Sequence, residues 1–126
     1  MRTLLSLGIM MFVALAPIAV GALQGEHGFS GGNELVRWMR ESEAVRDQQP
    51  QGNPLEAGLY AGYVMGAYDQ MKMRGELCGT RNVSVGQVAS VVAKFLKGHP
   101  EKLHNPANLL VLEAFAESFP CRQPAR

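Results

Sequence analysis

The chain has 126 residues, 47% of them hydrophobic, and its 12 Lys and Arg nearly balance its 11 Asp and Glu. This length accommodates one domain, since domains typically span about 100–200 residues. The near-zero net charge argues against a nucleic-acid-binding protein, which needs a basic face.

The first 22 residues have the pattern of a secretory signal peptide. Arg2 precedes an apolar stretch from Leu4 to Val20, and Val20-Gly21-Ala22 offers small residues for cleavage. The stretch is short for a transmembrane anchor and is interrupted by a glycine and a proline, so a permanent membrane span is the weaker alternative. We expect export and a mature chain of 104 residues that is not held in a membrane.

Cysteine usage agrees with export. The chain has two cysteines, Cys78 and Cys121. An oxidising compartment favours a disulfide between them, with a reactive thiol pair as the alternative. A disulfide would close the chain between the two cysteines into a loop and stabilise the fold by ~4 kcal/mol if the native geometry is unstrained.

The segment after the leader predicts an arm followed by a helix. Residues 23–32 are rich in glycine and predict a flexible arm. Asn33 predicts an N-cap for a helix that continues to about Glu43. Its apolar side comprises Leu35, Val36, Trp38 and Met39. Residues 47–54 contain two prolines and a glycine, and they predict a loop without an evident anchor.

A long helix is predicted from Leu55 to Met73, with Gly75 ending it. Its apolar residues at helical spacing are Tyr60, Tyr63, Val64, Ala67 and Met71. Three glycines, Gly58, Gly62 and Gly66, recur on one face of this helix. Because each glycine costs a helix about 1 kcal/mol relative to alanine, we expect Trp38 or a helix backbone to pack against that face.

Two further helices are predicted in the last third of the chain. Ser84 and Gln87 form a capping-box pattern, ahead of an apolar face of Val85, Val88, Val91, Val92, Phe95 and Leu96. After a short turn at 101–103, Asn105-Pro106 predicts a cap and first helical residue. The apolar face of that last helix is Leu109, Leu110, Leu112, Phe115, Ala116 and Phe119, and Pro120 stops it. Residues 33–126 are therefore predicted to form an all-α domain of four to five helices with one disulfide.

The sequence shows no evident set of catalytic or metal-binding residues. Ser30 lies in a Gly-x-Ser-x-Gly pattern, but no strand precedes it to build a nucleophile elbow. His99 and His104 flank Glu101 without an ordered third imidazole, since His27 lies in the arm, so helix capping is the preferred interpretation. Asn82-Val83-Ser84 fits the acceptor pattern for N-glycosylation, which matters only if the source is eukaryotic. We expect no enzyme activity, no metal and no cofactor.

The sequence resembles the immunity proteins of type VI secretion amidase effectors, the Rap/Tai group. The resemblance covers nearly the whole mature chain. It rests on the segments 32–36, 62–66, Cys78, 83–87, 94–96, 99–107, 114–115 and 119–121. The run from His99 to Ala107 and the ending at Phe119-Pro120-Cys121 are its most specific parts.

This resemblance implies a periplasmic helical protein, often a homodimer, that binds and blocks a peptidoglycan amidase delivered by a neighbouring cell. The target would be a papain-like Cys-His enzyme. Members of the group commonly carry a second cysteine pair, which here would fall near Met39 and Tyr60, so those residues could pack together instead of bridging. The rival hypothesis is a small periplasmic helical chaperone of the acid-stress type.

An inhibitor of this kind needs a rigid projection. The connection from Arg74 to Asn82 is polar, has glycines on both sides of Cys78 and would be fixed by the disulfide. We predict that Arg74, Glu76, Arg81 and Asn82 contact the amidase, the alternative being a solvated turn.

Overall fold

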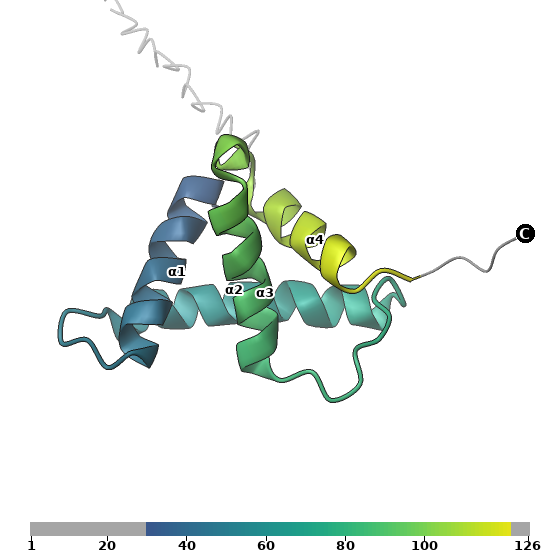
Figure 1. Ribbon diagram of the computed structural model, residues 1–126, viewed down its shortest axis with the longest axis horizontal. Coiled ribbons are helices and arrows are strands. Elements are labelled where there is room, and N and C mark those ends of the chain that lie inside the picture. Colours follow the sequence, from purple (N-terminus) through teal and green to yellow (C-terminus); the bar gives the residue numbers. More distant parts are fainter. Residues whose placement is uncertain (1–29, 122–126) are drawn as a thin grey trace, which may run out of the picture.

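The computed structural model describes residues 30–121, so the predicted signal peptide, most of the predicted arm and His27 lie outside the described part. Four α-helices and one short 3-10 helix follow each other: α1 (Gly32–Arg46), α2 (Pro54–Met73), α3 (Val85–Gly98), η1 (Pro100–Lys102) and α4 (Ala107–Ser118). α2 lies across the back of the molecule, and α1, α3 and α4 pack against one side of it (Figure 1). The prediction of an all-α fold is confirmed.

The core lies between α2 and the three helices in front of it. Leu35 of α1, Val64 of α2, Val92 of α3 and Phe115 of α4 are each fully buried there. Burial raises the pKa of Tyr60, with a smaller contribution from Glu43. The Tyr60 hydroxyl donates to the carbonyl oxygen of Ala89 at 2.8 Å and so links α2 to α3.

Met39 and Tyr60, the positions where the second cysteine pair would fall, are both buried in this core. No covalent bond joins the first two helices there, because neither residue is a cysteine. α1 and α2 therefore depend on noncovalent packing at these positions.

The start of α1 differs from the prediction. Gly31, not Asn33, is its N-cap, and Asn33 is exposed. The Gly32 N–H donates to the carbonyl oxygen of Asn105, and the Ala107 N–H donates to that of Ser30, both at 2.9 Å. Residues 30–32 of the predicted arm thus belong to the fold, because Gly32 has no Cβ and can approach the backbone near α4 closely.

α4 exposes residues that the sequence predicted to be buried. Its helix begins at Ala107 with Pro106 as N-cap, so Asn105 does not cap it. Leu109 and Leu112 are 47% and 37% exposed, and Ala116 is exposed as well. Val111 and Ala114 are buried in their place. α4 packs against several helices, so an apolar pattern covering most of its circumference did not identify which side faces the core.

The capping-box prediction for α3 is confirmed. The Ser84 hydroxyl accepts from the Gln87 N–H, and the Gln87 side chain accepts from the Ser84 N–H at 2.8 Å. Most of the predicted apolar face of α3 is buried, with Val88 and Val92 at 0% exposure. Val85 is exposed, at 57%, and Val91 is half-buried.

Candidate functional site

The connection between α2 and α3, residues 75–84, is called the disulfide loop here. The predicted disulfide between Cys78 and Cys121 is confirmed, with the two Cα atoms 4.9 Å apart. The Cys78 N–H also donates to the carbonyl oxygen of Phe119 at 3.1 Å. Leu77 inserts into the core beside this bond and is 6% exposed. The middle of the loop is thereby attached to the end of α4.

Both ends of the disulfide loop are defined by local backbone geometry. Gly75 has φ +72° and ends α2 as predicted, with the Glu76 N–H donating to the carbonyl oxygen of Met71 at 3.0 Å. Asn82 has φ +60°, which asparagine adopts more readily than most residues. The loop therefore has a fixed shape between two helices.

The four predicted contact residues all lie on or beside this loop. Arg74 is the C-cap of α2, and Glu76, Arg81 and Asn82 follow within the connection. All four are exposed, and the Arg74 guanidinium lies 3.8 Å from the Glu76 carboxylate. Such an exposed pair contributes little to stability, so these side chains are free to meet a partner.

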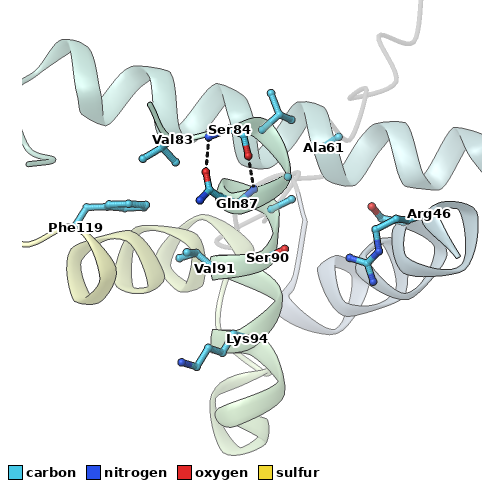
Figure 2. A pocket seen from close by; sticks show the side chains of 13 residues that line it. Arg46, Ala61, Val83, Ser84, Gln87, Ser90, Val91, Lys94 and Phe119 are labelled. Atoms are coloured by element: carbon cyan, nitrogen blue, oxygen red, sulfur yellow. Dashed lines mark hydrogen bonds between the residues drawn. The ribbon is translucent and has the colours of Figure 1, made fainter. Parts of the chain in front are cut away.

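An open pocket lies beside the disulfide loop, at the N-terminal half of α3, and is called the α3 pocket here. Its volume is about 750 Å³. Figure 2 shows Arg46 of α1 at one side of α3 and Phe119 at the other. Its lining residues are Ser42, Arg46, Ala61, Val83, Ser84, Val85, Gly86, Gln87, Ala89, Ser90, Val91, Lys94 and Phe119.

The lining of the α3 pocket is apolar apart from a few hydroxyl and amide groups and two cations. Arg46 and Lys94 are its charged residues, and no carboxylate lines it. Asp47 lies 3.1 Å from the Arg46 guanidinium in an exposed pair, and Lys94 has no ion-pair partner within residues 30–121. This pocket was not predicted from the sequence. The signal available was Val85, an apolar residue in the first turn of an amphipathic helix.

The glycine face of α2 is exposed, contrary to the prediction. A Cβ built on Gly58, Gly62 or Gly66 would meet nothing within 4 Å. Within the described chain, neither Trp38 nor a helix backbone packs there, because α2 turns a different face, which carries the buried Tyr60 and Val64, toward the core. Trp38 instead contacts the edge of Tyr63, at a centroid distance of 6.3 Å.

The other candidate residues from the sequence take part in contacts that hold the fold together. The Ser30 side chain is 3% exposed and its hydroxyl has no hydrogen-bond partner. Its backbone carbonyl accepts a hydrogen bond from the Ala107 N–H, so Ser30 links the start of α1 to the start of α4 and does not follow a strand.

His99 has the capping role that the sequence favoured. It is the C-cap of α3, and its Nδ1 lies 2.9 Å from the carbonyl oxygen of Phe95 while its ring stacks on the Phe95 ring. His104 is exposed. Between residues 30 and 121, no three His, Cys, Asp or Glu side chains gather in a way that could hold a metal ion. In the same range, no helix has the length and apolarity needed to cross a bilayer.

The described chain is a small helical domain with a covalently attached loop and an adjoining open pocket. The comparison with known families identifies it further. Residues 31–121 match the model of the Rap1a immunity proteins, and the chain belongs to that family. No curated protein and no solved structure gave a match.

Proposed function

We propose that this protein is an exported immunity protein that binds and blocks a peptidoglycan amidase effector of type VI secretion. The observation that carries the proposal is the family match, which spans residues 31–121 and so includes the disulfide loop and the α3 pocket. The leader-like residues 1–22 support export to the periplasm, where such an amidase would act.

The disulfide loop is suited to the inhibitory contact. A loop that is already ordered loses little conformational entropy on binding, so more of the contact energy appears as affinity. In this proposal the rim of the amidase cleft makes polar contacts with four exposed side chains, those of Arg74, Glu76, Arg81 and Asn82. The loop backbone excludes the peptide substrate from the cleft.

A protection assay tests the function. Candidate amidase effectors from the source genome, above all one encoded beside this gene, are directed to the periplasm of a bacterial host. Co-expression of this protein with its leader should restore growth, and a version starting at residue 23 should not. A chaperone of the acid-stress type would protect against acid and not against the amidase. If the protein protects against none of these amidases, the proposal is rejected.

The contact residues are tested with a triple variant. Replacing Arg74, Glu76 and Arg81 by alanine should weaken binding to the protective amidase by a few kcal/mol in calorimetry. The melting temperature should hardly change, since all three side chains are exposed. Unaltered affinity would place the interface on another face.

We also include a homodimer in the proposal. Leu59 and Met73 of α2 are 44% and 88% exposed, and with Leu109 and Leu112 of α4 they leave considerable apolar surface uncovered. Sedimentation at micromolar concentration should show a dimer, and Leu59→Asp should shift it toward monomer. A monomeric wild type would reject this part alone.

A further inference from the structure

We propose that the α3 pocket receives an acidic, apolar segment of the amidase effector, next to the contact made by the disulfide loop. This inference rests on the function proposed above and adds a second contact region together with the chemistry of the partner segment. Three features of the pocket lead to it: an uncovered apolar residue, charged side chains that are all positive, and a continuous connection to the disulfide loop.

Val85 is the uncovered apolar residue. It precedes Val88 by three positions and Val92 by seven, so the three share one side of α3. Val88 and Val92 are fully buried, whereas Val85 is 57% exposed. At its level α2 contributes only the small side chain of Ala61 to the pocket. The pocket is thus an open end of the core, where an apolar side chain from a partner would complete the packing.

The charge on the pocket specifies what accompanies that apolar side chain. Arg46 of α1 lies on one side of α3, and the side chain of Lys94, a residue of α3, extends on the other side, as Figure 2 shows. The lining contains no carboxylate. The N-terminal half of α3 adds the positive end of its helix dipole. Asp47 offsets Arg46 in part, but that pair is exposed and therefore weak. A segment with carboxylates beside an apolar residue complements both properties.

The pocket is continuous with the disulfide loop. Val83 and Ser84 belong to the loop and also line the pocket. Phe119 lines the pocket and accepts the hydrogen bond from Cys78 that holds the loop. A partner that covers the loop therefore reaches the pocket without crossing another element of this chain.

Calorimetry with the protective amidase, carrying an inactivated nucleophile, tests the inference. Val85→Asp should weaken binding by about 100-fold or more, because it sets a negative charge against a partner carboxylate. Asp in the first turn suits the helix dipole, so α3 should remain folded. Val85→Lys removes the same apolar contact but keeps the charge favourable, so it should weaken binding by only about tenfold. The double variant Arg46→Glu with Lys94→Glu should lose about tenfold or more.

Leu55→Asp is the matched control. Leu55 is 72% exposed in the first turn of α2, so the substitution likewise places an aspartate where an exposed aliphatic residue stood near a helix start, but outside the pocket. It should leave the affinity for the amidase unchanged. Circular dichroism and the melting temperature of each variant check that it is folded.

The outcomes separate the inference from the proposed function. If no amidase binds the wild-type protein, both fail. If the wild type binds and the pocket variants bind equally well, the pocket is rejected while the function stands. Equal losses for Val85→Asp and Val85→Lys would reject an acidic partner. A change in the sedimentation of the free protein, with no change in amidase affinity, would assign the pocket to a second copy of this chain.

Discussion

The two longest connections of the described chain, residues 47–53 and 75–84, are both mostly polar and mostly exposed, yet they are held in different ways. The disulfide loop is joined to the end of α4 by the Cys78–Cys121 bond. The 47–53 connection has no covalent attachment, and the sequence suggested that it has no anchor at all. It is nevertheless anchored, because the Glu41 carboxylate accepts from the Asn53 N–H at 2.8 Å.

Further backbone contacts complete that noncovalent anchor. The Gln49 N–H donates to the carbonyl oxygen of Ala44 at 2.9 Å, and Gly52 lies close to the backbone of Val45. Asn53 in turn caps α2 by accepting from the N–H of Leu55 at 3.0 Å. The 47–53 connection is thus held by hydrogen bonds to α1, the helix just before it, whereas the disulfide loop is attached to a residue 43 positions further along the chain.

The largest expected effect comes from removing the covalent attachment. Replacing Cys78 and Cys121 by serine should lower the free energy of unfolding by ~4 kcal/mol, because the two residues are 43 positions apart and the bond restricts the unfolded chain. Urea unfolding measures the loss, and reduced wild-type protein is the control. Hydrogen exchange should accelerate in 75–84 and not in 47–53. Equal acceleration in both connections would show that the two anchors are coupled.

A smaller loss is expected from crowding the noncovalent anchor. A Cβ at Gly52 would lie 2.9 Å from the backbone nitrogen of Val45, so Gly52→Ala should destabilise the protein by about 1–3 kcal/mol. Gly62→Ala is the control, since its Cβ would meet open space and should stabilise α2 by up to about 1 kcal/mol. Thermal unfolding compares the two. The same sign for both would contradict the structural assignment of these glycines.

Removing one hydrogen bond of that anchor should cost less again. Glu41→Ala leaves the Asn53 N–H without its acceptor and should destabilise by about 1 kcal/mol. Glu41→Gln keeps a carbonyl oxygen at the same place and should retain most of the stability. If alanine and glutamine behave alike in urea unfolding, the Glu41 contact does not hold the 47–53 connection.

The smallest effect concerns one left-handed residue in each connection. Gln48 has φ +55° and Asn82 has φ +60°. Glycine relieves the steric cost of that conformation, which asparagine already bears better than glutamine. Gln48→Gly should therefore stabilise by up to about 1 kcal/mol, and Asn82→Gly by less. A larger gain at Asn82 in paired melting curves would reverse this order.

Much of the fold could be predicted from local signals in the sequence. The helix-ending Gly75, the Ser84 and Gln87 capping box and the His99 cap depend on residues near one another in the chain. The cysteine pair could also be predicted, since a chain with two cysteines permits only one intramolecular disulfide. The exposed positions of the four predicted contact residues follow from the polar segment in which they lie.

The sequence by itself therefore determined the helices, several of their ends and the disulfide, because capping geometry and cysteine pairing leave few alternatives. The tertiary structure decided which side of each helix is covered. It placed α1, α3 and α4 on one side of α2, which exposed Gly62, and it left Val85 uncovered at the end of the core. Helical periodicity shows that a residue shares a face with others, but burial requires a neighbouring element at that level. For this reason the α3 pocket could be found only in the structure.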